Sequence, residues 1–336
     1  MAVKKQLDEL LLATADVGSL PIQDDFDEAR RNVDQAIIDK VSLGLDYPCY
    51  PQLAGSSSKP MNMALQFLIP LSKVEPNIQI RGEDVRLLSD EIKETSAVVG
   101  VERAEYYQKF LQEQGLMHKV RGTKACITGP FTLASYLDRK SLLSCGASKP
   151  KVVAALAQML SRSCKRLSDL GFDLVNIDEP FLSVMLGRGV LFRYDEKFVI
   201  ETLNMLVSEI SCLSAIHVCG TITPLVKTVL LGSEADIVDH EFAGSPGNLQ
   251  AYSRDDLEGA DKFLAYGCVS SVSLRVETVE EISGSLRNAL SILGARIMAK
   301  PDCGFGGMQG VAGAYGIVLK KLRNMVDAAH TVAVTS

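Results

Sequence analysis

Four residues in three separate stretches of this chain have side chains that commonly bind soft divalent metal ions. His217 and Cys219 lie close together, Glu241 follows later, and Cys303 stands near the C-terminal end. Two thiolates, an imidazole and a carboxylate form a complete ligand set for Zn²⁺, which prefers four nitrogen, sulfur and oxygen donors. The sequence therefore predicts a zinc site built from these four side chains.

The spacing of His217 and Cys219 allows both side chains to reach one metal ion. A single residue, Val218, separates them, and in an extended strand alternate side chains point to the same face. Glu241 and Cys303 would join only through the fold, unlike a zinc knuckle, in which two C-x-x-C turns hold the metal locally. His240 competes with Glu241 as a ligand, but alternation points it to the opposite face. This convergence of distant ligands is typical of a reaction centre.

The elements that must position these residues are short apolar runs separated by amphipathic stretches. The runs are Thr14–Val17, Leu43–Asp46, Lys124–Thr128, Phe172–Ile177, Leu213–Val218, Ala235–Asp239, Phe263–Cys268 and Arg296–Lys300. The helix-length stretches between the later runs are Lys151–Leu170, Glu196–Ser211, Thr223–Leu231 and Val279–Leu293. Short strands that alternate with helices indicate a parallel sheet covered on both faces.

Eight such strands favour the α/β class and a (β/α)8 TIM barrel, because eight is the number that closes this barrel. We expect a single domain over residues 1–336, with an inserted segment, Gln52–Val99, after the second strand. Within it, Gly55–Pro60 is typical of a mobile loop, followed by one or more helices. The alternative is an open doubly wound sheet, but the first turn, Val17–Pro21, lacks the G-x-G-x-x-G of dinucleotide-binding sheets.

Polar and reactive residues recur at the C-terminal ends of the predicted strands. They include Ser19, Asp178, His217 and Cys303. In a TIM barrel this rim carries the active site. The recurrence over several strands therefore favours an enzyme. By contrast, we interpret Cys126, Cys164, Cys212 and Cys268 as small buried apolar residues.

Composition excludes several classes of protein. The chain has 336 residues, 47% apolar and 23% charged, as in globular proteins. Its net charge of −6 argues against nucleic-acid binding, and no apolar run is long enough to span a membrane. Met1–Glu9 lacks the apolar core of a signal peptide. The eight cysteines are then expected to be thiols or metal ligands in a reducing, cytoplasmic compartment.

Taken together, the motifs resemble the C-terminal catalytic barrel of the cobalamin-independent methionine synthase family. The stretches that carry the resemblance are Val17–Pro21, Gly44–Asp46, Gly129–Thr132, Ile177–Pro180, His217–Cys219, Glu241 and Pro301–Gly304. The resemblance covers nearly the whole chain, and its ligand set is more specific than its Gly-Ser and Gly-Pro turns, which uroporphyrinogen decarboxylase-like barrels share.

The resemblance implies zinc-dependent methyl transfer to the thiol of homocysteine, forming methionine. His217, Cys219, Glu241 and Cys303 would hold zinc. Ser19 and Asp178 would contact the amino-acid part of the substrate. Gln52 aligns with a Glu that binds the substrate amine in the family, and a neutral amide pairs less strongly with an ammonium.

Two further departures bear on the methyl donor. The family's full-length enzymes carry a second barrel that helps to bind a folate. We expect no such barrel here, and Val272 aligns with a His proposed as proton donor. The resemblance is therefore closest to the short single-domain "core" members. These take the methyl group from a methylated corrinoid, as methylcobalamin or on a corrinoid protein.

Other functions remain open on the residues alone. The barrel could transfer methyl or alkyl groups to or from another thiol, such as coenzyme M, with the same metal. A decarboxylase-like barrel without metal would leave Cys219 and Cys303 without a purpose. A zinc-stabilised scaffold without catalysis would lose stability on chelation and methylate no thiol.

Overall fold

The computed structural model describes most of the chain. The described residues are 10–21, 29–53, 55–56, 59–60, 63–82, 84–93, 95–139, 141, 144–187 and 194–335. Residues 1–9, on which the prediction of no signal peptide depends, lie outside them. The single domain over residues 1–336 stays a prediction. No described helix is both long enough and apolar enough to cross a membrane.

A six-stranded parallel sheet forms most of the barrel wall. Its strands are β7 (Lys124–Thr128), β8 (Leu174–Asp178), β9 (Leu213–Val218), β10 (Ile237–Glu241), β11 (Phe263–Val269) and β12 (Ile297–Pro301). They pair in sequence order, each parallel to its neighbours. The bounds of β7 and β9 are those predicted, and the other four predicted strands lie within a few residues of their observed positions.

Two very short segments close the ring between β12 and β7. Thr14 bridges to Ala299 of β12, Ala15 bridges to Tyr47, and Cys49 bridges to Lys124 of β7, all in parallel. With these two segments the wall has the eight parallel members of a TIM barrel. The predicted fold class is confirmed.

The predicted second strand, Leu43–Asp46, was wrong in position. Helix α2 (Ala29–Ser42) continues to that point, and the next residues form its C-terminal turn. Gly44 has a φ of +81°, and its N–H donates to the carbonyl of Val41 at 3.1 Å. A glycine in the left-handed region ends helices in this way. The chain therefore becomes extended only after this turn, and bridges the barrel at Tyr47 and Cys49.

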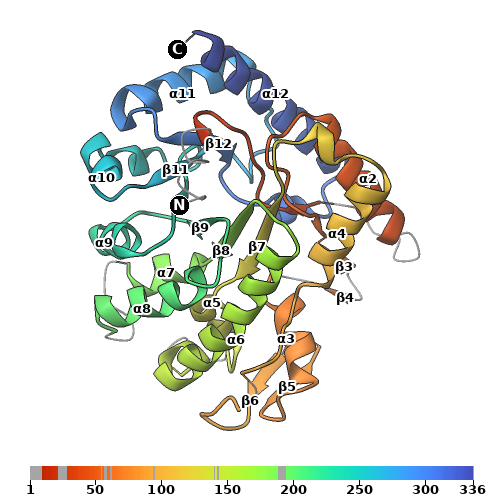
Figure 1. The fold of residues 1–336 in the computed structure, drawn as a ribbon, viewed down its shortest axis with the longest axis vertical. Helices are drawn as coiled ribbons and strands as arrows, with labels where there is room; N and C mark the ends of the chain where they lie inside the picture. The colour runs from red at the N-terminus through yellow and green to blue at the C-terminus, as the bar shows by residue number, and fades with distance from the viewer. Residues whose placement is uncertain are drawn as a thin grey trace.

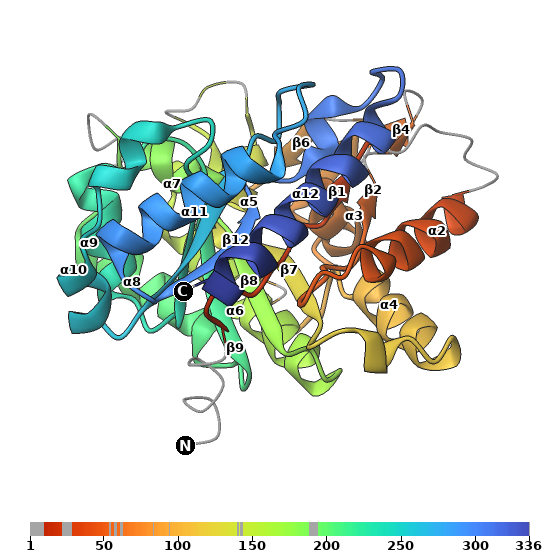
Figure 2. The ribbon, with the colours of Figure 1, turned by 90° about the horizontal axis from the view of Figure 1, so that it is seen from above.

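Helices cover the outer face of the barrel (Figures 1 and 2). They are α4 (Glu102–Glu113), α5 (Pro130–Tyr136), α6 (Pro150–Asp169), α7 (Pro180–Met185), α8 (Glu196–Val207), α9 (Pro224–Gly232), α10 (Arg254–Gly259), α11 (Val279–Leu293) and α12 (Ala314–Thr335). The four predicted helices are confirmed as α6, α8, α9 and α11. In both views α11 and α12 lie side by side.

Burial on both faces explains why the strands are apolar runs rather than alternating patterns. Every residue of β7, β8, β9, β11 and β12 is buried. One face packs on the helices and the other fills the barrel interior, as in parallel sheets generally. Polar side chains also occupy the interior, including Lys124, Asn176, Asp239 and Lys300. These buried charges need partners, and they lie next to the site described below.

The described residues of the inserted segment after the second barrel member form two short hairpins and a helix. Residues predicted as a mobile loop contain a short antiparallel pair, β3 (Gly55–Ser56) with β4 (Lys59–Pro60), and their mobility stays a prediction. The predicted helix is present as α3 (Leu65–Ser72). A second hairpin follows, β5 (Ile78–Arg81) with β6 (Asp84–Leu87), and Figure 1 shows it beside α3 at the periphery of the barrel.

A buried ion pair fixes the first barrel segment to the second. The Nζ atom of Lys40, on α2, lies 2.6 Å from Oδ2 of Asp16. The same ammonium donates to the carbonyls of Gly18 and Cys49, and Oδ1 of Asp16 accepts from the N–H of Cys49 at 2.7 Å. Just beyond this point, β1 (Ser19–Leu20) pairs in parallel with β2 (Gln52–Leu53).

We expect Lys40→Met to lower the free energy of unfolding by about 3–5 kcal/mol, because it leaves the Asp16 carboxylate buried without its cation. Urea denaturation followed by circular dichroism measures this loss. Lys109→Met is the control, because Lys109 is 72% exposed and pairs with Glu113 on the surface. It should change stability by less than about 1 kcal/mol. Equal losses in the two variants would contradict the role of the buried pair.

Candidate metal centre and its cavity

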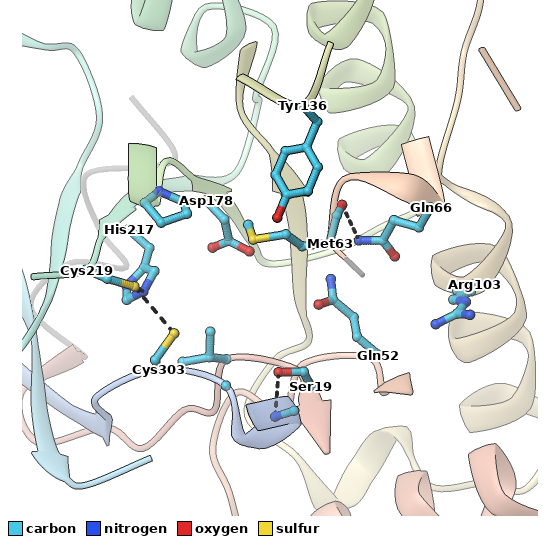
Figure 3. Close-up of a pocket in the computed structure, with 14 residues that line it drawn as sticks. Ser19, Gln52, Met63, Gln66, Arg103, Tyr136, Asp178, His217, Cys219 and Cys303 are labelled. Carbon is cyan, nitrogen blue, oxygen red and sulfur yellow. Dashed lines mark hydrogen bonds between the residues drawn. The ribbon is translucent and has the colours of Figure 1, made fainter. Parts of the chain in front are cut away.

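Three of the four predicted metal ligands meet at the C-terminal rim of the barrel. His217 lies near the end of β9, Cys219 follows that strand, and Cys303 follows β12. Nε2 of His217 is 2.9 Å from Sγ of Cys219, which is 3.4 Å from Sγ of Cys303. The three donor atoms all lie within 4.8 Å of one another. Figure 3 shows the three side chains directed toward one point.

Two glycines allow the loops at this rim to approach each other. Gly220 follows Cys219 with a φ of +83°, which turns the chain away directly after the ligand. Gly304 follows Cys303, and a Cβ atom there would lie only 1.9 Å from Oγ of Ser19. A side chain at this position would therefore displace either the Ser19 hydroxyl or the Cys303 loop.

The structure does not bring Glu241 into this cluster. Its Oε1 accepts a hydrogen bond from Oγ of Ser245 at 2.5 Å, and the group of close metal donors among the described residues contains only His217, Cys219 and Cys303. Glu241 ends β10 on the same rim. Its role as a fourth ligand stays a prediction.

His240 does not compete for the metal. Its Nδ1 lies 2.9 Å from the carbonyl oxygen of Val218 and its Nε2 lies 3.0 Å from the Tyr252 hydroxyl. Both ring nitrogens are therefore engaged on the other face of β10, as alternation predicted. Burial lowers the pKa of His240 to about 4, which keeps the ring neutral.

The Asp239 carboxylate contacts the His217 ring in the barrel interior and fixes its orientation. Its Oδ1 lies 2.6 Å from Nδ1 of His217 and 2.5 Å from Nζ of Lys300, and its Oδ2 lies 3.7 Å from Nζ of Lys124. All four side chains are buried. A carboxylate on one ring nitrogen of a metal-binding His orients the ring and directs the other nitrogen to the metal. Here that other nitrogen, Nε2, faces Cys219.

The same contacts set the charges of the site. Burial alone would lower the pKa of His217, but the Asp239 carboxylate outweighs it and raises this pKa to about 9. Burial likewise opposes ionisation of Asp239, yet the Lys300 ammonium and His217 lower its pKa below the usual range. Sequence analysis assigned Asp239 no role. The available signal was an acidic residue inside an apolar run, on the same strand face as Glu241.

The two cysteines form a polarised pair. A hydrogen bond between them lowers the pKa of Cys303 well below its usual value, with His217 and Lys300 acting in the same direction. The same hydrogen bond, together with burial, raises the pKa of Cys219. A cysteine sulfur that ionises readily, a second thiol and an oriented His ring form a donor set that fits zinc, provided that binding releases the proton from the ring. The residues present therefore suit the metal that the sequence predicts.

A cavity of about 320 Å³ opens beside these donors. The metal donors form one wall (Figure 3). The other polar side chains that line it are Ser19, Gln52, Gln66, Arg103, Tyr136 and Asp178. The three predicted substrate contacts, Ser19, Gln52 and Asp178, therefore all reach the same cavity, although their roles stay predictions.

Each of these three side chains makes a hydrogen bond to another residue of the protein. Oγ of Ser19 accepts from the N–H of Gly306 at 3.3 Å, and the Gln52 amide donates to Sγ of Cys126 at 2.7 Å. Asp178 accepts from the Asn176 amide at 2.5 Å, and burial raises its pKa to about 6. The site is thus largely pre-formed.

The sequence did not predict three polar residues that line the cavity away from the metal donors. Gln66 comes from α3 in the inserted segment, Arg103 from α4 and Tyr136 from α5. No motif includes these residues: Gln66 and Arg103 lie on helices that reach the rim through packing, and Tyr136 lies at the far end of α5, beyond the Gly129–Thr132 motif. Val272, the residue aligned with the family's His, is 78% exposed and is not among the residues that line the cavity.

Comparisons with known proteins identify the family of this chain. The family described as "Cobalamin-independent synthase, Catalytic domain" matches residues 77–331. The chain is similar to a methionine synthase of Methanothermobacter thermautotrophicus, with 28% identity over 90% of each chain.

Two solved structures share the fold. One is a B12-independent methionine synthase from Shewanella sp. W3-18-1 in complex with selenomethionine, at a TM-score of 0.67 and 19% identity, covering 97% of this chain and 98% of that chain. The other is a methyltransferase from Methanosarcina mazei, at a TM-score of 0.64 and 16% identity, covering 98% of this chain and 90% of that chain.

We expect Cys219→Ser and Cys303→Ser to abolish tight zinc binding, because a hydroxyl does not provide the soft anionic donor that a thiolate does. Metal analysis after gel filtration measures bound zinc per chain. Cys212→Ser is the control, because Cys212 is a half-buried cysteine outside the cluster. Full zinc content in both site variants would contradict the predicted centre.

We expect Asp239→Asn to weaken zinc binding by roughly 10–100-fold, because the amide no longer fixes His217 as a charged acceptor does. Competition with a chromophoric chelator measures the affinity. The matched control is Asp236→Asn, because Asp236 lies just before β10 and accepts hydrogen bonds from Ser214. An unchanged affinity in Asp239→Asn, or an equal loss in the control, would count against this role.

Proposed function

This chain belongs to the family of cobalamin-independent synthases, and on that premise we propose that it transfers a methyl group to the thiol of homocysteine at a zinc site. The observation that carries the proposal is the cluster of His217, Cys219 and Cys303 on the wall of a substrate-sized cavity. A decarboxylase-like barrel gains no support, because the matched family is a synthase family.

Zinc, when bound, would supply one thing: it would hold the acceptor thiol as a thiolate near neutral pH, where a free thiol is mostly protonated. The chain's part is to provide the soft donors. Cys219 and Cys303 add negative charge at the site, and His217 enters as a ring oriented by Asp239. Electron-rich donors of this kind favour a nucleophilic sulfur over a strongly acidic metal.

The remaining polar residues would hold the amino-acid part of homocysteine. Asp178 offers the only carboxylate among the described residues that line the cavity, and it would pair with the substrate ammonium. Gln52 donates its amide N–H to Cys126, so that its carbonyl oxygen is the atom left to accept from the ammonium. Ser19 would complete the contacts, since its Oγ lies beside the Cys303 loop.

The methyl donor is the finer part of the proposal. The sequence resemblance predicts a methylated corrinoid, either free methylcobalamin or a corrinoid protein. The likenesses give this donor no support, because the family is described as cobalamin-independent. In its favour, the exposed Val272 provides no proton donor for a leaving group such as a folate amine. The corrinoid donor and the corrinoid protein partner therefore stay predictions.

The test is an anaerobic assay of the zinc-loaded enzyme with homocysteine and either methylcobalamin or methyltetrahydrofolate. Methionine is quantified by mass spectrometry, and loss of the methyl–cobalt species is followed optically. We expect methionine with at least one donor, and at least about a 100-fold lower rate after chelation or in Cys303→Ser, because the thiolate is then lost. Cys212→Ser should retain the full rate.

Three results would change the conclusion. If the rate of methionine formation is undiminished after chelation, zinc takes no part in the reaction. Methylation of coenzyme M but not of homocysteine would replace the acceptor. If no thiol is methylated while chelation lowers the melting temperature, the metal is structural.

A further inference from the structure

The cavity extends beyond the residues that the proposed function uses. Arg103 lies in the first turn of α4 (Glu102–Glu113) and lines the cavity. Figure 3 places it on the side opposite His217, Cys219 and Cys303, with Gln52 and Met63 between. The far end of the cavity therefore carries a permanent positive charge, because a guanidinium does not deprotonate in proteins.

No described residue neutralises this charge. The guanidinium of Arg103 makes no ion pair or hydrogen bond with any residue in the described part of the chain. The nearby acid on the same helix, Glu105, pairs instead with Arg166, whose Nη2 lies 2.6 Å from its Oε1. Asp178, the acid that lines the cavity, lies beside His217 in Figure 3 and far from Arg103.

Arg103 is the only lysine or arginine among the described residues that line the cavity. The Gln52 amide donates to Cys126 and the Gln66 amide donates to the carbonyl of Met63. Tyr136 directs its hydroxyl into the cavity. The guanidinium of Arg139 lies 4.7 Å from the centre of the Tyr136 ring, but Arg139 is not among the residues that line the cavity. This end is cationic in a protein of net charge −6.

We propose that Arg103 is an anion-binding residue, which receives a carboxylate or phosphate group of a substrate whose reacting end lies at the metal donors. A planar guanidinium binds such oxyanions through two parallel hydrogen bonds. The acid near the metal and the cation at the far end together orient a substrate that carries both charges. This inference rests on the proposed function only in placing the reacting sulfur beside Cys219 and Cys303.

The anion can come from either substrate. It is the carboxylate of the thiol acceptor, or an acidic group of the methyl donor, such as a glutamate or phosphate. Both sources use the same chemistry at Arg103, and binding of the acceptor alone separates them.

The first experiment is calorimetric titration of the zinc-loaded full chain with three thiols: homocysteine, 4-sulfanylbutanoate, which lacks the amine, and 3-sulfanylpropan-1-amine, which lacks the carboxylate. If the acceptor supplies the anion, Arg103→Gln weakens the two carboxylate-bearing thiols about 10–100-fold and leaves the amine unchanged, as expected for loss of a charged hydrogen bond. Arg103→Lys retains part of the affinity, because it keeps the charge but not the planar fork.

The second experiment measures the KM and kcat of the methyl donor in the same variants. If the donor supplies the anion, the thiol affinities are unchanged in Arg103→Gln, while the KM of the donor rises about 10–100-fold with little change in kcat. Lys109→Gln is the matched control, because it removes a positive charge from the exposed face of the same helix. Zinc content and circular dichroism verify that each variant is folded and loaded.

Unchanged thiol affinities together with an unchanged donor KM in Arg103→Gln would overturn the proposal. The proposal would also fail if the wild-type protein bound neither carboxylate-bearing thiol and the KM of the methyl donor were the same in the wild type and in Arg103→Gln. A different result would contradict the proposed function alone. If homocysteine binds poorly while 4-sulfanylbutanoate binds in an Arg103-dependent way, homocysteine is not the acceptor, but Arg103 is still an anion-binding residue.

Discussion

A single buried carboxylate, Asp239, supports the organisation of this site. It stands between the His217 ring and the ammonium groups of Lys300 and Lys124, in the interior of the barrel. None of these charges could be buried alone at an acceptable cost, but together they compensate one another. The network fixes the orientation of His217, and it places positive charge beneath the two cysteine sulfurs. The metal donors at the rim are thus set by the electrostatics of the layer below them.

The closure of the barrel places the second wall of the cavity. Bridges at Thr14 and Cys49 join the first two barrel segments to the six-stranded sheet, and Ala15 bridges the first segment to the second at Tyr47. The buried pair of Lys40 and Asp16 strengthens this seam. Since β1 and β2 begin immediately beyond it, the seam determines where Ser19 and Gln52 face the metal donors. Stability at the seam and substrate geometry at the rim are therefore linked.

The cavity separates charge along its length. Cys303 and the Asp178 carboxylate lie at one end, and the Arg103 guanidinium lies at the other. Such an arrangement can align a small polar substrate before any chemical step, which is how pre-organised sites contribute to rate and specificity. The inserted segment and the helices of the outer layer provide this second end. The barrel strands and their loops position the metal donors, and the inserted segment and outer helices provide the side chains at the opposite end of the cavity.

The sequence by itself determined the elements and the faces of the site. Periodicity located β7 and β9 with their observed bounds, and the one-residue spacing of His217 and Cys219 placed both on one face, because strand alternation is a local property. Parallel strands end at one rim, so the convergence of Cys303 could also be expected. The Gly44 turn, which delays the second barrel segment to Tyr47, was misread because a helix C-terminus and a short buried strand look alike over so few residues.

Only the tertiary structure decided which side chains meet. Glu241 turns to Ser245 rather than joining the cysteines, and this depends on the loop that follows β10. Asp239, an unmarked acid in an apolar run, acquires its role only when Lys124 and Lys300 arrive from other strands. Arg103 reaches the cavity because α4 packs against the barrel at one particular angle and register. Such contacts depend on interactions between distant segments, whereas sequence patterns record the conformation and burial of each segment separately.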